Sequence, residues 1–362
     1  MRVIIVLILS LVAVASCAPR NVAKTAPPAA DAQIVPVWVA THRALDTTGP
    51  AFGVKRSEKM SYLRVDVSVP STHKPGQIEW PGPYAAPDAA TDFVLTGSQV
   101  LPDAGALVRA LPHPGPVRET LVFVHGYNVT LSDGLYRLAQ MAHDFEMPNP
   151  PVLFSWQSAG DARGYIYDRD SVLYARDDLE TFLQQLTRTA NDRVVLVAHS
   201  MGSQLVMETM RQMALKGDRR TLSRIDGVVL MSPDIDTDVF LRQARSIGEL
   251  PQPFLIFVSS NDRILGLSSV LTGRKERLGL LNSPEEVEGL DVSILDFSEL
   301  SGGAETSHDV ASTSPAAISV LEGMLQQARS GEDAFENYMV LTEQPQQGGG
   351  LLPGGGGLLP GF

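Results

Sequence analysis

Residues 192–203 read Asp-Arg-Val-Val-Leu-Val-Ala-His-Ser-Met-Gly-Ser. The four aliphatic residues 194–197 predict a strand that is buried on both faces. From Gln204 to Lys216 the apolar residues recur with helical spacing, and Gly217 can end the helix that this predicts. The chain must therefore turn from a buried strand into a helix within one or two residues, around Ser200.

The turn has the sequence Ala198-His199-Ser200-Met201-Gly202. This is the G-x-S-x-G nucleophile elbow with alanine in place of its first glycine. Small residues are needed beside the serine, because larger side chains would collide with the neighbouring backbone. Such a turn lifts the hydroxyl clear of the sheet and points the N-terminal N–H groups of the helix toward whatever that oxygen attacks. Ser200 is therefore the candidate nucleophile.

Composition limits what else the chain can be. It has 362 residues, of which 44% are hydrophobic and 19% charged, so it can bury a large core and is not a disordered protein. The formal charge of −12 argues against sequence-independent binding to nucleic acid and against broad attraction to anionic lipid. We expect one large domain with appendages.

The N-terminus has the features of an export signal, which we place at residues 1–16. A basic start is followed by the apolar run Val3–Val14, which is too short to span a bilayer as a mature helix. Cys17 is the single cysteine of the chain, and Val14-Ala15-Ser16-Cys17 resembles the bacterial lipobox, whose cysteine is lipidated. The alternative is an ordinary signal peptide followed by an unused cysteine.

The lipobox resemblance implies a location. A lipidated Cys17 would anchor the domain to a membrane of the bacterial cell envelope. Ala18 follows the cysteine where an aspartate would favour the inner membrane, so the resemblance favours the outer membrane, with the domain facing the periplasm.

The rest of the chain divides by composition and periodicity. Residues 17–33 are rich in Ala and Pro and predict a flexible tether. Residues 34–118 predict antiparallel strands and loops, and residues 119–330 alternate strands with helices, which favours a mostly parallel sheet covered by helices on both faces. The Gly/Leu/Pro-rich segment 331–362 predicts a low-complexity, disordered tail.

A nucleophilic hydroxyl needs a base, and the base needs an acid that orients it. In an open parallel sheet these groups lie at the carboxyl ends of strands. His308 is the one histidine after the last predicted strand, and Asp262 directly follows the strand predicted at 254–259. Asp234 or Asp236, one strand earlier, could orient the imidazole instead.

Five motifs make residues 34–330 similar to the α/β-hydrolase superfamily, and within it to a bacterial family whose substrates are undefined. They are Val39-Ala40-Thr41-His42-Arg43, His125-Gly126-Tyr127-Asn128, the elbow, Ser232-Pro233-Asp234-Ile235-Asp236 and Ser259-Ser260-Asn261-Asp262-Arg263.

The resemblance implies an α/β fold and a role for each site residue. Ser200 would be the nucleophile, His308 the general base and then acid, and Asp262 the orienting acid. The backbone N–H groups of Met201 and Tyr127 would form the oxyanion hole. Ala198 departs from the family pattern, which bears on local packing alone.

The remaining histidines and aromatics are assigned weaker roles. His199 is expected to pack, and His125 to support the oxyanion loop. The other histidines are scattered and have no metal-ligand spacing, so we expect neither a metal nor a cofactor; they are His42, His73, His113 and His143. Trp156, Tyr165 and Tyr167 either line a substrate pocket beneath a mobile flap or pack in the core.

The sequence thus predicts an exported, lipid-anchored serine hydrolase that cleaves carboxylic esters through an acyl-enzyme. One alternative is a catalytically silent envelope lipoprotein that uses the fold for binding. Another is a lipase or phospholipase acting on membrane lipid. Small soluble esters are the favoured substrates, because the sequence has no long apolar lid helix. The oligomeric state does not follow from the sequence.

Overall fold

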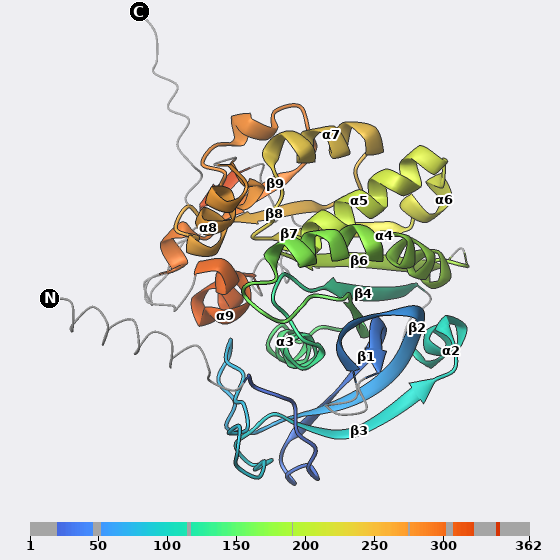
Figure 1. The fold of residues 1–362 in the computed structure, drawn as a ribbon, viewed down its shortest axis with the longest axis vertical. Coiled ribbons are helices and arrows are strands. Elements are labelled where there is room, and N and C mark those ends of the chain that lie inside the picture. The colour runs from blue at the N-terminus through green and yellow to red at the C-terminus, as the bar shows by residue number, and fades with distance from the viewer. Residues whose placement is uncertain are drawn as a thin grey trace, which may run out of the picture.

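The computed structural model describes residues 20–45, 52–113, 117–189, 191–273, 276–301, 307–321 and 338–340. Within these residues ten strands form one sheet, in the order β10-β9-β8-β7-β6-β4-β5-β1-β2-β3 (Figure 1). Helices cover both faces of the sheet, so the predicted α/β fold class is confirmed.

The seven strands after residue 117 run parallel to one another. They are β4 (Arg118–Val124), β5 (Pro151–Ser155), β6 (Asp192–His199), β7 (Ile225–Met231), β8 (Phe254–Val258), β9 (Ser293–Asp296) and β10 (Tyr338–Val340). Their side chains alternate between two cores, one on each face. In β4, Val122 and Val124 enter one core, while Leu121 and Phe123 enter the other. Burial on both faces explains the continuous aliphatic runs in these strands.

The N-terminal strands extend the same sheet, as Figure 1 shows. β1 (Gln33–Leu45) pairs parallel with β5, and it pairs antiparallel with β2 (Phe52–Val69), which pairs antiparallel with β3 (Val94–Leu101). The predicted antiparallel N-terminal strands are therefore present, and they complete the sheet at one edge.

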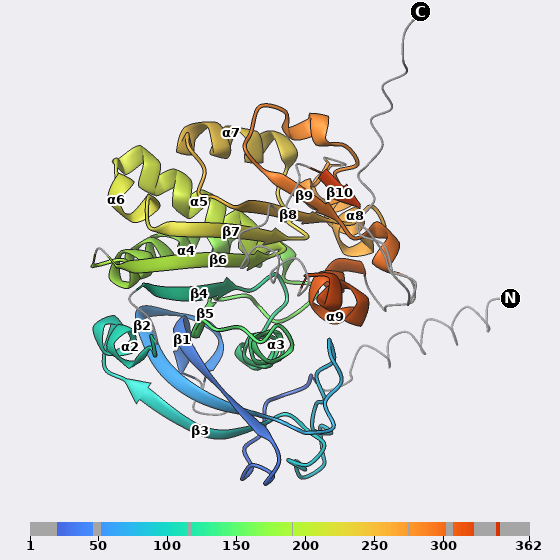
Figure 2. The same ribbon diagram turned by 180° about the vertical axis from the view of Figure 1, so that it is seen from behind.

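The helices separate into two layers (Figures 1 and 2). The layer over one face contains α2 (Ala104–Ala110), α4 (Tyr165–Leu186), α5 (Met201–Lys216), α6 (Arg219–Leu222) and α7 (Thr237–Ile247). The layer over the other face contains α3 (Leu131–Asp144), α9 (Val310–Thr313) and the helical residues 315–321. The remaining elements are α8 (Arg263–Leu271) and the 3₁₀ turns Leu278–Leu280, Pro284–Val287, Ser298–Ser301 and Ser307–Asp309.

The tether prediction is wrong for residues 20–33. The Leu95 N–H donates to the Lys24 carbonyl over 2.8 Å, and the Ala26 N–H donates to the Leu95 carbonyl over 3.1 Å. β3 is the last strand of the sheet, so its outer edge has backbone groups that need partners. A composition rich in Ala and Pro does not reveal such backbone pairing.

The disordered-tail prediction is wrong for three of its residues. Tyr338–Val340 form β10, which pairs parallel with β9, and Met339 is buried. Tyr and Val favour strands, but three residues are too few for a period to be read. The rest of the segment 331–362 lies outside the described residues, as do the predicted signal peptide, Cys17 and Ala18. No helix in the described part of the chain is long and apolar enough to cross a membrane.

Candidate active site

Ser200 occupies a strained turn between β6 and α5. Its backbone angles are φ 52° and ψ −121°, a region that non-glycine residues enter at a cost of roughly 1–3 kcal/mol. Its N–H donates to the Met231 carbonyl over 2.9 Å, and its carbonyl accepts from the Asp234 N–H over 3.2 Å. These two bonds to the neighbouring β7 segment hold the strained residue in place.

Two glycines make this turn possible. A Cβ on Gly202 would lie 2.4 Å from the carbonyl oxygens of Val124 and His125, so no side chain fits there. A Cβ on Gly126 would lie 2.9 Å from the Ser200 Cβ. The first elbow position tolerates Ala198, which is a fully buried residue of β6.

His308 and Asp262 form a buried pair at the carboxyl end of the sheet. The His308 Nδ1–H donates to Asp262 Oδ2 over 2.7 Å, and the Asp262 side chain is fully buried. The other oxygen, Oδ1, accepts from the N–H groups of Ile264 and Leu265, at the start of α8. The helix thus orients the carboxylate, and the carboxylate leaves the lone pair of His308 on Nε2.

Hydrogen bonds also hold the His308 backbone against the elbow. Its carbonyl accepts from Ser232 Oγ over 2.8 Å and from His199 Nε2 over 3.2 Å. The rings of His199 and His308 have their centroids 4.7 Å apart. His199 precedes Ser200 in the turn, and Ser232 follows Met231, whose carbonyl accepts from the Ser200 N–H. No hydrogen bond joins Ser200 Oγ to His308, both of which are described; such bonds are often long until substrate binds.

The pKa values of the three histidines around the elbow, His125, His199 and His308, shift in different directions. Burial lowers the pKa of His308, but the hydrogen bond and charge of Asp262, with Asp309 and Asp234, outweigh it, and the net shift is upward. Burial lowers the pKa of His199 to about 4 and that of His125 to about 3. At neutral pH the last two are neutral, which fits packing roles.

The alternative acids are engaged elsewhere. Asp234 accepts from Tyr165 Oη over 2.9 Å and from Ser268 Oγ over 2.5 Å, and it lies 3.2 Å from the Arg277 Nε. Asp236 caps the N-terminus of α7. Of the three aspartates considered from the sequence, Asp262 is the one that contacts the His308 ring.

The predicted oxyanion donors lie on the two segments that flank Ser200. Met201 begins α5, and Tyr127 follows Gly126 after β4. Neither backbone N–H donates to an acceptor in the described part of the chain. His125 supports the loop: its ring stacks on Trp156, and its carbonyl accepts from the Trp156 Nε1–H over 2.7 Å.

Buried charges that the sequence did not single out for a role hold this loop. Arg43 is buried, and its guanidinium donates to the carbonyls of Val129 (2.7 Å) and Ser158 (3.0 Å). Asp168 accepts from the Asn128 N–H (3.1 Å) and from Ser158 Oγ (2.6 Å). Burial lowers the pKa of Arg43 to about 10, so it stays charged at neutral pH.

We expect Arg43→Met to lower the free energy of unfolding by about 3–5 kcal/mol, because it leaves Asp168 and several carbonyls buried without their cation. Urea unfolding followed by circular dichroism measures this change. Arg163→Met is the matched control, since the Arg163 side chain is 89% exposed. Equal unfolding midpoints for the two variants would show that the buried network does not stabilise the fold.

A cavity of about 340 Å³ opens beside the elbow. Its lining includes Trp80, Gly126, Asp133, Arg137, His199 and His308. Trp80 and Arg137 were missed from the sequence: Trp80 lies in a stretch without periodicity, and Arg137 is a charged residue on a predicted helix.

The predicted pocket residues do not line this cavity. Trp156 is fully buried in the core, and Tyr165 is buried and bonded to Asp234. Tyr167 is 38% exposed, with the Arg56 guanidinium 4.8 Å from its ring centroid. Both tyrosines belong to α4, which begins at Tyr165.

Comparison with known proteins identifies a family. A model of the family described as "Alpha/beta hydrolase of unknown function (DUF900)" matches residues 109–326, more than half of the chain. No curated protein matches.

Solved structures of three hydrolases also match at low similarity. A dienelactone hydrolase from Anabaena variabilis is 11% identical (TM-score 0.37; 78% of this chain, 97% of that one). An inhibited esterase B from Lactobacillus rhamnosis is 15% identical (TM-score 0.36; 60% of this chain, 79% of that one). A fungal esterase from Rhizomucor miehei is 12% identical (TM-score 0.36; 85% of this chain, 86% of that one). Similarity this low does not bear on the substrate.

Proposed function

We propose that this chain, which belongs to the α/β-hydrolase family matched over residues 109–326, is a serine hydrolase that cleaves carboxylic esters through an acyl-enzyme. The observation that carries the proposal is the buried His308–Asp262 hydrogen bond, held against the Ser200 turn by the His308 carbonyl. Structural packing alone does not call for a strained serine, an oriented imidazole and two free N–H groups at one edge of a sheet.

The chemistry would follow from these positions. Ser200 Oγ attacks the ester carbonyl while His308 Nε2 takes its proton, and the N–H groups of Met201 and Tyr127 donate to the oxyanion. His308 then protonates the leaving alcohol, and the acyl group stays on Ser200. Water, deprotonated by His308, hydrolyses the acyl-enzyme. Asp262 holds the imidazole in place and stabilises the imidazolium that forms.

A panel of p-nitrophenyl esters of increasing acyl length tests the proposal and gives the acyl preference. We expect turnover that a fluorophosphonate probe abolishes. Absence of reaction with every ester and with the probe would contradict an enzyme and support the catalytically silent lipoprotein.

The pH dependence should follow His308. Its imidazole must be neutral to accept the serine proton, so kcat/KM should fall as pH drops through its pKa. Since the pKa of His308 is raised, we expect this fall to be centred above the ordinary histidine value of 6.5. A pH profile of kcat/KM measures the midpoint. A fall centred near 4 would instead point to His199 as the titrating group.

One observation favours membrane lipid esters as substrates over small soluble ones. Arg20 donates to Gly160 O (2.5 Å) and Asn128 Oδ1 (2.8 Å), and it lies 2.6 Å from Asp133 Oδ2. Asn128 and Asp133 line the cavity. Arg20 follows Cys17 by three residues, and three residues of extended chain span at most about 11 Å. If Cys17 carries lipid, this contact would keep the cavity close to the membrane surface.

We therefore expect Arg20→Ala to lower turnover of an ester embedded in vesicles by about tenfold, through a lower effective concentration, while p-nitrophenyl acetate turnover stays unchanged. Cys17→Ser should give the same pattern, and Arg163→Ala should leave both rates unchanged. Equal effects of Arg20→Ala on the two substrates would contradict a role in placing the cavity at the membrane.

A further inference from the structure

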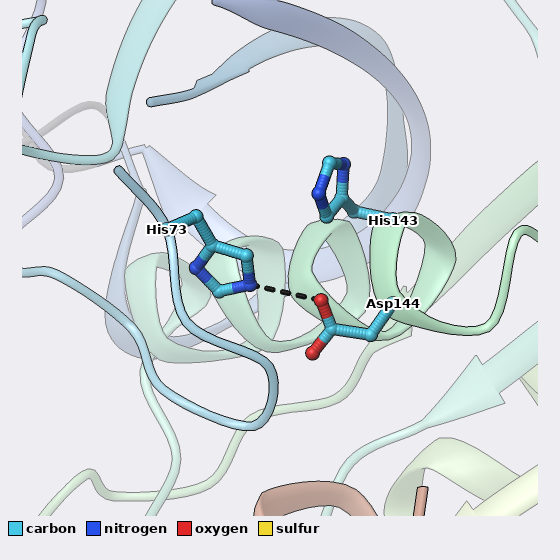
Figure 3. Close-up of side chains that lie close together, drawn as sticks. All are labelled: His73, His143 and Asp144. Atoms are coloured by element: carbon cyan, nitrogen blue, oxygen red, sulfur yellow. Dashed lines mark hydrogen bonds and ion pairs between the residues drawn. The ribbon is translucent and has the colours of Figure 1, made fainter. Parts of the chain in front are cut away.

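A second cluster of reactive side chains lies at the end of helix α3. Figure 3 shows His73 reaching from the loop after β2 toward Asp144, with the ring of His143 beside them. One possible ligand atom from each residue lies within 4.8 Å of the other two. It is the one group with such spacing that His, Cys and carboxylate side chains form in the described ranges.

Outer contacts orient two of these side chains in the way that metal ligands are oriented. His73 uses Nδ1 to bond Glu79 Oε2 over 2.8 Å, which directs Nε2 toward Asp144 Oδ1, also at 2.8 Å. On Asp144, Oδ2 accepts from the Gly76 N–H (2.7 Å) and from Gln140 Nε2 (2.6 Å), which leaves Oδ1 facing the histidine. A carboxylate behind the histidine and donors behind the aspartate are characteristic of a metal site's outer shell.

The packing of the described residues does not explain why position 143 is a histidine. Neither ring nitrogen has a hydrogen-bond partner in the described part of the chain, and Nδ1 is buried. Its ring centroid lies 5.2 Å from that of His73, with the rings nearly perpendicular. A buried nitrogen without a partner costs free energy, so an imidazole here calls for a ligand.

We propose that His73, His143 and Asp144 bind one zinc ion, with water as the fourth ligand. Two imidazole nitrogens and one carboxylate oxygen suit zinc, whereas magnesium and calcium prefer oxygen ligands alone. Tetrahedral ligands at about 2.1 Å from zinc lie roughly 3.4 Å apart, so side-chain adjustments are enough to close the site. The ion takes the place of the proton between His73 Nε2 and Asp144 Oδ1.

Zinc at this place would join the loop after β2 to helix α3. The same loop continues to Ile78 and Trp80, which line the cavity beside Gly126 and His308. The ion is therefore assigned a structural role, in which it fixes one wall of that cavity. The site itself does not depend on the proposed ester hydrolysis.

Equilibrium dialysis of the full chain tests the proposal. The protein is first freed of metal with EDTA, then dialysed against micromolar zinc chloride, and bound zinc is counted by mass spectrometry. We expect one zinc ion per chain, no uptake of magnesium, and affinity weaker by roughly tenfold or more in His143→Gln. His143 is the residue of choice, because neither of its ring nitrogens bonds the rest of the fold.

His113→Gln, a histidine outside the cluster, is the matched control and should bind zinc like the unmodified chain. X-ray absorption at the zinc edge should show two imidazoles and oxygen ligands. Failure of the unmodified chain to take up zinc would overturn the proposal. So would equal affinity in the unmodified chain and in folded His143→Gln, because the ion would then lie elsewhere.

Discussion

Ser200→Ala is expected to lower kcat for ester hydrolysis by roughly 10⁴- to 10⁶-fold, and to abolish covalent labelling by a fluorophosphonate. The reason is chemical, since alanine has no oxygen to attack the carbonyl or to receive the acyl group. The fold should survive, because no hydrogen bond of the described residues uses the Ser200 hydroxyl. Steady-state kinetics with a p-nitrophenyl ester measures the change.

Ser203→Ala is the matched control. Ser203 also lies near the start of α5 and is fully buried, but its hydroxyl donates to the Ala198 carbonyl, and the residue does not line the cavity. We expect this variant to retain its rate. Equal turnover by Ser200→Ala and the unmodified chain would remove Ser200 from the mechanism.

The second large effect on kcat is expected from replacing Asp262, the acid that orients His308. Asp262→Asn should lower kcat by about 10⁴-fold, because an amide cannot stabilise the imidazolium and can favour the wrong tautomer of His308. The substitution is otherwise mild. The asparagine carbonyl can still accept from the N–H groups of Ile264 and Leu265, so α8 keeps its N-terminal cap.

Asp234→Asn separates the two candidate acids. Asp234 binds Tyr165, Ser268 and Arg277 rather than the His308 ring, so its loss should lower stability while kcat stays close to that of the unmodified chain. Turnover that survives Asp262→Asn and disappears in Asp234→Asn would show that our assignment of the acid is wrong.

The parallel core and the pairing of His308 with Asp262 could be predicted from the sequence. The elbow is a local pattern: a buried aliphatic run, Ser200 between the small residues Ala198 and Gly202, and an amphipathic helix. Local patterns of this kind can be recognised in a sequence. Asp262 and His308 lie far apart in the chain. Both follow buried strands, however, and parallel strands bring their carboxyl ends to one edge.

Contacts made by segments whose apolar residues follow neither a helical nor a strand period could not be predicted. The N-terminal residues pair with the free edge of β3, which exists only once the sheet has formed. Trp80 reaches the cavity through a loop broken by Pro and Gly. Arg43 and Asp168 are ordinary charged residues until the fold buries them together.

The His73 cluster shows the same limit. His143 and Asp144 adjoin each other at the end of a helix, a spacing that carries no metal signature. His73 is brought to them from a distant loop. From the sequence, therefore, neither histidine had a role and no metal was expected, whereas the three-dimensional arrangement supports a zinc site.

The most direct test of the account is the position of the covalent adduct. The protein is labelled with a fluorophosphonate, digested, and the modified peptide sequenced by mass spectrometry. The account predicts a single phosphonylated residue, Ser200. An adduct on any other residue, in protein whose turnover the probe has abolished, would contradict it.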